Sequence, residues 1–170
     1  MIYTSGSTGV PKGAMLSHRN LVAISVGIHK AMRTTQASRV AQFFVPSFDG
    51  VLAEVLPALM AGSTVVFGSR TQLLPGPAMV EWLARERITH LAIVPSAFGL
   101  MPQASLPELE TIVMAGEATP AETARRWAPG CRIVNCYGPT ECAICVSMCE
   151  YWEENADGAR AARRTALPRA

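Results

Sequence analysis

Short apolar runs alternate along this chain with stretches in which apolar residues recur every three or four positions. Runs such as 64–67 and 111–115 have the length of strands and are apolar at successive positions rather than at every second one. Strands of that kind are buried on both faces, which is typical of a parallel sheet covered by helices. The pattern predicts an α/β fold, in which parallel-sheet layers are flanked by helices.

Caps and breakers bound the expected helices. Ser17 is a suitable N-cap for a helix that continues to about Met32, and Asp49 is one for a helix that ends at Gly62. Pro57 lies inside the second helix and predicts a kink. The other expected elements are a helix over 79–87, a helix with Thr119 as N-cap and Pro120 in its first turn, and strands at 2–3, 40–45, 64–67, 88–94, 111–115 and 132–136.

Composition narrows the possible classes of protein. Of the 170 residues, 49% are hydrophobic and 16% are charged, so we expect one folded domain rather than a disordered chain. A formal net charge of +2 argues against a nucleic-acid partner, and no apolar run reaches the ~18 residues of a membrane span. The five cysteines are an odd number, and the first residues do not resemble a secretion signal. We therefore expect a cytoplasmic protein with reduced thiols and with no nucleic-acid or membrane partner.

The composition changes near the C-terminus. From about Tyr151 the sequence has no apolar periodicity and few large hydrophobic residues. We expect one domain over 1–149 and an exposed or disordered tail over 150–170.

A glycine-rich loop over 3–13 carries the strongest chemical signal. It reads Tyr-Thr-Ser-Gly-Ser-Thr-Gly-Val-Pro-Lys-Gly. A concave row of amide, hydroxyl and ammonium donors of this kind suits phosphate oxygens. The loop is not a Walker A loop, because Lys12 is followed by Gly13 rather than by Ser or Thr. The alternative is a flexible Ser/Gly turn without a ligand.

Four motifs together resemble one family. Besides the loop, they are Asn-Cys-Tyr-Gly-Pro-Thr-Glu at 135–141, Ala-Gly-Glu-Ala at 115–118 and Ser-Phe-Asp at 47–49. Their order and spacing resemble those of the adenylate-forming superfamily, which includes acyl-CoA synthetases, luciferases and the adenylation domains of nonribosomal peptide synthetases. The chain is most similar to those adenylation domains, over about residues 1–149. The resemblance implies part of the large N-terminal domain of such an enzyme.

The resemblance also implies an ATP site with Mg²⁺. In the family the glycine-rich loop closes over the β- and γ-phosphates, a tyrosine stacks on adenine, a threonine contacts the α-phosphate and a glutamate binds the metal. The matching tyrosine is Tyr137, and the matching catalytic pair is Thr140 and Glu141, with Glu141 also the metal ligand. The other residues implied in nucleotide binding are Thr4, Ser5, Gly6, Ser7, Thr8, Gly9, Lys12, Gly116, Glu117, Ala118, Asn135 and Gly138.

Asp49 separates substrate classes within the family. In amino-acid-activating members the aspartate after Phe pairs with the substrate α-ammonium, whereas fatty and aryl acids have no ammonium to bind. The structural alternative is that Asp49 only caps the helix after it. The family's side-chain pocket maps onto small or apolar positions, which implies an apolar amino acid bulkier than alanine or glycine. These positions are Gly50, Ala53, Ala92, Val113, Ala115, Cys136, Ile144 and Cys145.

The implied function is ATP-dependent activation of an apolar amino acid to its aminoacyl-adenylate for nonribosomal peptide synthesis. Phosphopantetheine on a partner carrier domain would then take the acyl group. The sequence has no counterpart of the family's C-terminal subdomain with its lysine, so we expect impaired turnover or a need for a companion chain.

Three alternatives remain open. The chain could be a fragment of an acyl-CoA synthetase-type carboxylate ligase, or a non-catalytic nucleotide-binding remnant. The third alternative is a zinc or iron–sulfur site on Cys136, Cys142, Cys145 and Cys149, which only one Cys-x-x-Cys pair supports.

Overall fold

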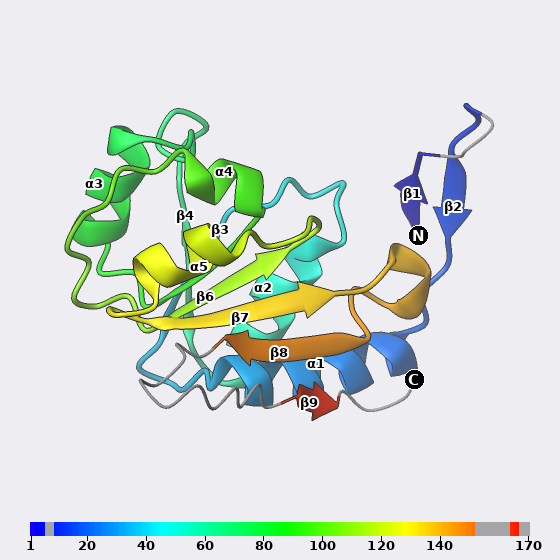
Figure 1. Ribbon diagram of the computed structural model, residues 1–170. Helices are drawn as coiled ribbons and strands as arrows, with labels where there is room; N and C mark the ends of the chain where they lie inside the picture. The colour runs from blue at the N-terminus through cyan, green and yellow to red at the C-terminus, as the bar shows by residue number, and fades with distance from the viewer. Residues whose placement is uncertain (6–8, 152–163, 167–170) are drawn as a thin grey trace.

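A mostly parallel β-sheet runs through the molecule (Figure 1). The computed structural model describes residues 1–5, 9–151 and 164–166, and within them seven strands form one sheet in the order β4-β3-β5-β6-β7-β8-β9. The first five strands of this order pair in parallel, whereas β8 and β9 pair antiparallel to their neighbours. The predicted α/β class is confirmed, with two antiparallel strands added at one edge. The strands are β3 (Arg39–Gln42), β4 (Thr64–Phe67), β5 (His90–Ile93), β6 (Thr111–Ala115), β7 (Arg132–Tyr137), β8 (Ser147–Tyr151) and β9 (Arg164–Ala166).

Helices cover both faces of this sheet (Figure 1). Successive strand residues point to opposite faces, so the pleat separates two hydrophobic cores. Leu91 and Ile112 belong to the core with α3, α4 and α5, whereas Ala92 and Val113 belong to the core with α1 and α2. The helices are α1 (His18–Met32), α2 (Gly50–Met60), α3 (Pro77–Arg85), α4 (Pro95–Gly99) and α5 (Ala121–Trp127).

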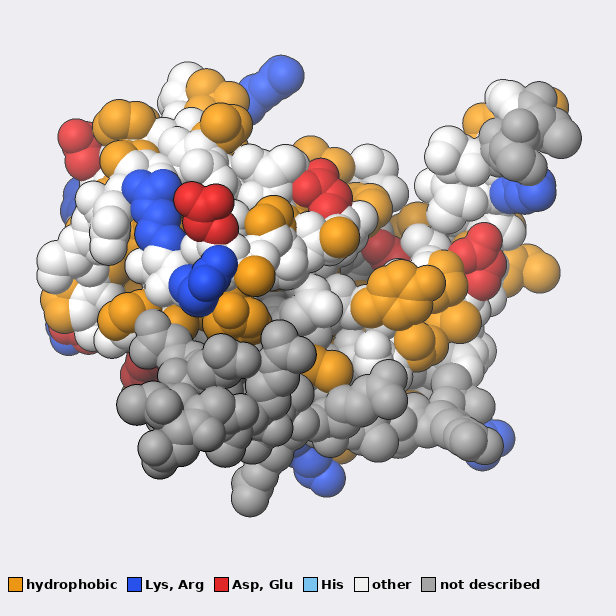
Figure 2. Space-filling view, in the orientation of Figure 1, with side chains coloured by type: hydrophobic (Ala, Val, Ile, Leu, Met, Phe, Trp, Pro, Cys, Tyr) orange, Lys and Arg blue, Asp and Glu red, His pale blue; other side chains and the backbone are white. Residues whose placement is uncertain are grey.

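The N-terminal segment is not part of the main sheet. β1 (Ile2–Thr4) and β2 (Lys12–Ala14) form an antiparallel hairpin, with Ile2 opposite Ala14 and Thr4 opposite Lys12. The hairpin projects from the body of the molecule, as Figures 1 and 2 show. The expected strand at 2–3 is therefore present, and within the described ranges its one partner is β2.

Several predicted boundaries agree with the structure. The strands at 64–67 and 111–115 have the bounds expected for them. Ser17 caps α1, because its Oγ accepts a hydrogen bond from Asn20 N at 3.2 Å. α2 begins directly after Asp49 and continues through Pro57 to Met60.

Other boundaries differ for local reasons. Thr119 does not cap α5, because its hydroxyl donates instead to Asn135 Oδ1 at 2.9 Å, and Pro120 occupies the N-cap position. β3 ends at Gln42 rather than at 45, because the side chain of Glu54 accepts hydrogen bonds from the next two backbone amides. The sequence pattern also missed α4, β8 and β9, and β9 falls within the expected tail.

A cluster of hydrogen bonds connects the C-terminal end of α1 to the amino-terminal ends of β5 and β7. Arg132, at the beginning of β7, donates to the carbonyl of Ala31 at 3.1 Å and to that of Met32 at 3.4 Å. Its guanidinium also forms a two-point ion pair with Glu150 on β8, at 2.7 and 3.0 Å. His90 Nε2 lies 3.0 Å from the Met32 carbonyl, and burial lowers the pKa of His90, so a neutral ring with its proton on Nε2 fits there. These donors satisfy carbonyls that the end of a helix leaves open.

Arg132→Ala should lower the free energy of unfolding by about 3 kcal/mol, because the Glu150 carboxylate loses a close cation and the α1 carbonyls lose a donor. Urea denaturation measures the change. The matched control is Arg87→Ala, since the Arg87 side chain is 71% exposed in its pair with Glu108 and should contribute less than about 1 kcal/mol. Equal losses in the two variants would contradict a structural role for the cluster.

Candidate functional site

The sequence motifs at 115–118 and 135–141 meet at one edge of the sheet. β6 ends at Ala115, directly before Gly116, and β7 ends at Tyr137. Because β5, β6 and β7 are adjacent and parallel, their carboxyl ends lie side by side. Open α/β sheets bind ligands outside these ends, so a ligand site is expected at this edge.

One hollow at this edge, named the tyrosine cavity below, brings together residues that the resemblance implied in nucleotide binding. Its solvent-accessible volume is about 370 Å³. Tyr137 is 68% exposed, so its ring is available to stack on a base. Figure 2 shows apolar side chains gathered over this end of β7. The cavity is lined by Gly116, Glu117, Ala118, Asn135, Cys136, Tyr137 and Gly138.

Two hydrogen-bonded bridges hold the wall of the tyrosine cavity. Glu117 accepts hydrogen bonds from Ser96 N at 2.9 Å and from Ser96 Oγ at 2.8 Å, which joins the turn after β6 to α4. The bond from Thr119 to Asn135 joins the same turn to β7. Gly116 itself has a φ of +86°, a conformation that favours glycine. The turn is therefore fixed to two different elements.

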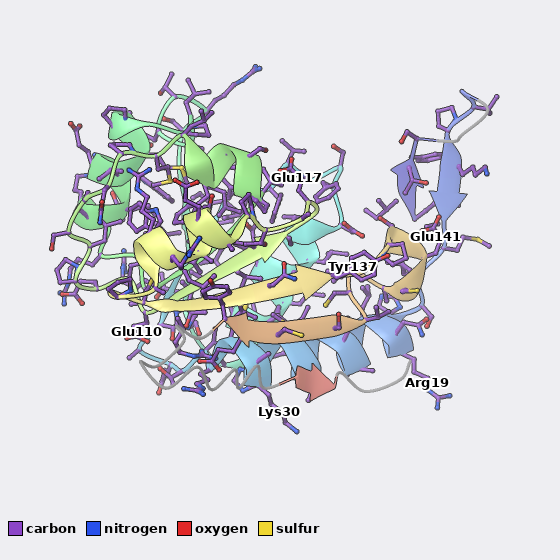
Figure 3. The ribbon with its side chains drawn as sticks, in the orientation of Figure 1. Arg19, Lys30, Glu110, Glu117, Tyr137 and Glu141 are labelled. Carbon is purple, nitrogen blue, oxygen red and sulfur yellow. The ribbon has the colours of Figure 1, made fainter. Side chains whose placement is uncertain are left out.

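The loop after Tyr137 folds back against β8. Val146 N donates to the Tyr137 carbonyl at 2.9 Å. Gly138 packs so closely that an added Cβ would lie 2.3 Å from Cys145 Cα. The loop contains the short helix η1 (Thr140–Cys142), which places the predicted catalytic pair at the same end of the molecule as Tyr137 (Figure 3).

Glu141 can serve as a metal ligand. Its side chain is exposed on η1. Mg²⁺ prefers hard oxygen ligands and commonly binds one or two carboxylates together with substrate phosphates. An exposed carboxylate at the same end of the molecule as the tyrosine cavity is chemically suited to the ion that the resemblance implied.

A second, apolar cavity adjoins the tyrosine cavity and shares Gly116, Cys136 and Gly138 with it. Its solvent-accessible volume is about 50 Å³. The structure places every predicted pocket position on its lining except Cys145, which is buried behind it. The predicted residues that line it are Asp49, Gly50, Ala53, Ala92, Val113, Ala115, Cys136 and Ile144.

Sequence reasoning missed part of this lining. Ile28 and Met32 come from α1. Their spacing of four residues predicts that they share one face of the helix, but it does not predict what that face packs against. Phe44 and Phe48 come from the segment between β3 and α2, and Met148 comes from β8. The apolar cavity is therefore enclosed mainly by residues of the core that contains α1 and α2, and not by the motif residues alone.

Asp49 is the only charged residue among the described residues that line the apolar cavity. It is 5% exposed, and its carboxylate accepts no hydrogen bond from the start of α2, which removes the helix-capping alternative. A buried carboxylate is costly unless a cation or a set of donors satisfies it. Asp49 is therefore placed to receive a positively charged group of a ligand.

Another buried acid lies behind the same wall. Glu54, on α2, accepts hydrogen bonds from Phe43 N at 3.0 Å and Phe44 N at 3.3 Å, the two amides that follow β3. It is 1% exposed, and burial raises the pKa of Glu54 to about 8, although the backbone bonds lower it in part. The sequence analysis did not identify Glu54.

The backbone is strained where Ile144 enters the apolar cavity. Ala143 and Ile144 have φ values of +56° and +78°, and a β-branched residue in that region is an outlier. Cys145 N donates to the Ala143 carbonyl at 3.0 Å, which closes a tight turn across Ile144. Strain of this kind persists where the surrounding structure over-determines it, and it is common at ligand sites.

The glycine-rich loop lies between β1 and β2. Thr4 and Lys12 face each other across the hairpin, Ser5 is exposed, and Gly9 has a φ of +82°. Gly6, Ser7 and Thr8 lie outside the described residues. The hairpin stands at the end of the molecule that carries Tyr137 and Glu141, although none of its described residues lines either cavity (Figure 3).

The cysteines do not assemble a metal site in the described part of the chain, where no three His, Cys, Asp or Glu side chains come together for an ion. Burial raises the pKa of Cys131 to about 11. A hydrogen bond between Cys136 and Cys145, together with burial, raises the pKa of Cys136 as well, so this cavity-lining thiol is protonated near neutrality. Within the described residues, no helix is long and apolar enough to span a membrane.

Comparison with known proteins agrees with this geometry. The sequence profile of the family described as AMP-binding enzyme matches residues 1–166, so the chain belongs to that family. A linear gramicidin synthase of Brevibacillus parabrevis is 44% identical over 148 residues, which are 87% of this chain and 3% of that protein. Novobiocin biosynthesis protein H of Streptomyces niveus is 45% identical over 148 residues, or 24% of its length. The chain thus spans a small part of these relatives.

Solved structures of adenylation domains are also similar to this chain. The adenylation domain AlmE of Vibrio cholerae, in complex with glycyl-adenosine-5'-phosphate, superposes with a TM-score of 0.83 at 26% identity, over 95% of this chain and 31% of that one. The nonribosomal peptide synthetase FmoA3 in its alpha-methyl-L-serine-AMP bound form gives a TM-score of 0.80 at 25% identity, over 91% and 18%. The chain is therefore similar to the adenylation domains of nonribosomal peptide synthetases.

Gly138→Ala should destabilise the fold by about 2–4 kcal/mol, because the new methyl group meets the Cys145 backbone, which cannot move aside as a side chain could. Chemical denaturation measures the loss. Gly99→Ala is the control, since nothing lies within 4 Å of a Cβ there, and an alanine in α4 should be neutral or stabilising. If Gly138→Ala behaved like this control, the described loop packing would be wrong.

Glu54→Gln should flatten the dependence of stability on pH. Since the pKa of Glu54 is raised from 4.5 to about 8, the folded state holds a proton that the unfolded state has released between these values. Its contribution to stability is therefore complete below pH 4.5 and is lost as pH rises toward 8, by up to about 1.4 kcal/mol per pH unit. Urea denaturation at pH 5.5, 6.5 and 7.5 should show the wild-type chain losing stability relative to the variant. A constant difference would refute the raised pKa.

Proposed function

We propose that this chain is part of an amino-acid adenylation domain of a nonribosomal peptide synthetase, and that it binds an apolar amino acid and ATP. The single observation that carries the proposal is the buried, uncapped carboxylate of Asp49 on an otherwise uncharged apolar cavity. An α-ammonium group satisfies this carboxylate, and the apolar lining accepts an uncharged side chain. The small residues Ala53 and Ala92 on the lining favour a side chain bulkier than that of alanine.

The adjoining tyrosine cavity would take the nucleotide. Its wall offers the exposed ring of Tyr137 for adenine and backbone groups around Gly116 and Gly138 for the rest of the ligand. The donors of the hairpin, among them Thr4, Ser5 and Lys12, would bind the β- and γ-phosphates. Both cavities share three lining residues, so the two ligands would meet where the substrate carboxylate must approach the α-phosphate.

The reaction that this arrangement supports joins the two ligands. An oxygen of the amino-acid carboxylate attacks the α-phosphorus of ATP, the bond to the bridging oxygen breaks, and pyrophosphate leaves with an aminoacyl-adenylate remaining. Thr140 would donate to the α-phosphate, and Glu141 would hold Mg²⁺, which when bound neutralises phosphate charge. The thiol of phosphopantetheine on a carrier domain would then take the acyl group and release AMP.

Asp49→Asn tests the substrate class, because it removes the charge and keeps the shape. Calorimetry with ATP·Mg²⁺ present should show that the variant loses at least about tenfold in affinity for leucine or phenylalanine. The same variant should bind the matched acids without an amino group, 4-methylpentanoate and 3-phenylpropanoate, as well as the parent chain does or better. The control is Glu122→Gln, an exposed acid on α5.

Two outcomes would decide against the proposal. Unchanged amino-acid affinity in Asp49→Asn would remove the ammonium role. Tighter binding by the parent chain of the acids than of the amino acids would favour the carboxylate-ligase alternative.

A further inference from the structure

Glu54 belongs to α2 but does not line the apolar cavity, although its neighbour Ala53 does. Its Oε1 accepts hydrogen bonds from Phe43 N and Phe44 N, and its Oε2 also accepts from Phe44 N, at 3.3 Å. Gln42 extends this network, since its Nε2 donates to Glu54 Oε2 at 3.4 Å and also to the Phe44 carbonyl. One buried side chain therefore binds the backbone directly after β3.

The segment held in this way carries part of the cavity wall. The Phe44 ring lies against Gly50, where an added Cβ would be 2.7 Å from the ring. The Phe44 and Phe48 ring centroids are 5.3 Å apart, and both rings line the apolar cavity. Asp49 follows Phe48 directly. The position of the Phe44 backbone thus sets where the ring, its partner Phe48 and the start of α2 can lie.

We propose that Glu54 is a positioning residue for the apolar cavity: it binds the amides of Phe43 and Phe44 and so fixes the aromatic wall beside Asp49. The strand ends at Gln42, so these two amides have no ladder partner, and a buried amide without an acceptor is costly. An apolar residue at 54 would fill the space but would leave both donors unsatisfied. The requirement is therefore for an acceptor atom at this position.

The charge of Glu54 is not what the segment needs. Its raised pKa shows that burial favours the protonated carboxyl near neutrality. Oε1 accepts from both amides, at 3.0 and 3.3 Å, and Oε2 accepts a second bond from Phe44 N alone. Glutamine keeps the Oε1 oxygen, so Glu54→Gln is the conservative variant and Glu54→Ala is the disruptive one. Glu81→Ala, an exposed glutamate on the helix α3, is the matched control.

Amide hydrogen exchange on the full chain tests the inference without any ligand. In Glu54→Ala the amides of Phe43 and Phe44 should exchange at least about tenfold faster, while those of β5 and β6 change little. Glu54→Gln should stay within about threefold of the parent chain. If Glu54→Ala does not fold, Gln42→Ala takes its place and should speed the same two amides by about threefold or more. Unchanged exchange at these amides in the folded disruptive variant would overturn the inference.

A second measurement, which rests on the proposed function, separates positioning from general stability. The ratio of affinities for phenylalanine and alanine should fall at least about fivefold in Glu54→Ala, because a mobile Phe44 no longer shapes the cavity, and Glu54→Gln should restore it. A loss of stability alone leaves this ratio unchanged, so an unchanged ratio beside fast exchange would overturn the positioning role. If the parent chain binds no amino acid, the proposed function fails, and the exchange experiment still decides the role of Glu54.

Discussion

Hydrogen bonding between β5, β6 and β7 aligns Ala92 with Val113 and Ala115 with Cys136. These four side chains point to the same face, toward α1 and α2, and they line the apolar cavity. A shift of β6 by one residue would turn Val113 and Ala115 to the other face and bring Ile112 or Met114 in their place, and a shift of β7 would replace Cys136 by Asn135 or Tyr137. Those larger side chains would fill the space that the cavity occupies. The register of these strands thus determines which side chains line the cavity, and no single residue does so alone.

The amino and carboxyl ends of the parallel strands make different contacts. At the start of β7, Arg132 and its partners bind the last carbonyls of α1 and join them to β8. At the carboxyl ends, the strands finish in turns held by a few hydrogen bonds, and Tyr137 is left exposed. The hydrogen bonds at the amino ends hold α1 against the sheet, whereas residues at the carboxyl ends line the two cavities. Open α/β sheets generally bind their ligands outside the carboxyl ends of the strands.

Much of this could be predicted from the sequence, for identifiable reasons. The strand at 111–115 is apolar throughout, and a strand buried on both faces has no other pattern available. The pocket positions from Asp49 to Ile144 could be mapped because the motifs that flank them fix their spacing. Glu54, Phe44 and Met32 could not be found in this way. Their place on the cavity or behind it depends on which face of a helix packs on the sheet and on where β3 stops, and both are decided by tertiary contacts.

Asp49, which precedes α2, and Glu54, which lies within it, show why burial alone does not identify a ligand site. Asp49 and Glu54 are five residues apart, which separates them by about 140° around a helix, and both are nearly inaccessible to water. Two backbone amides bind Glu54, and they offset the cost of its burial in part. Asp49 receives no such bond within the described chain, and it lies on a cavity that offers it no cation. The difference in hydrogen bonding, rather than the shared burial, distinguishes the two carboxyls: the protein binds Glu54, whereas Asp49 is the one that we propose for the substrate.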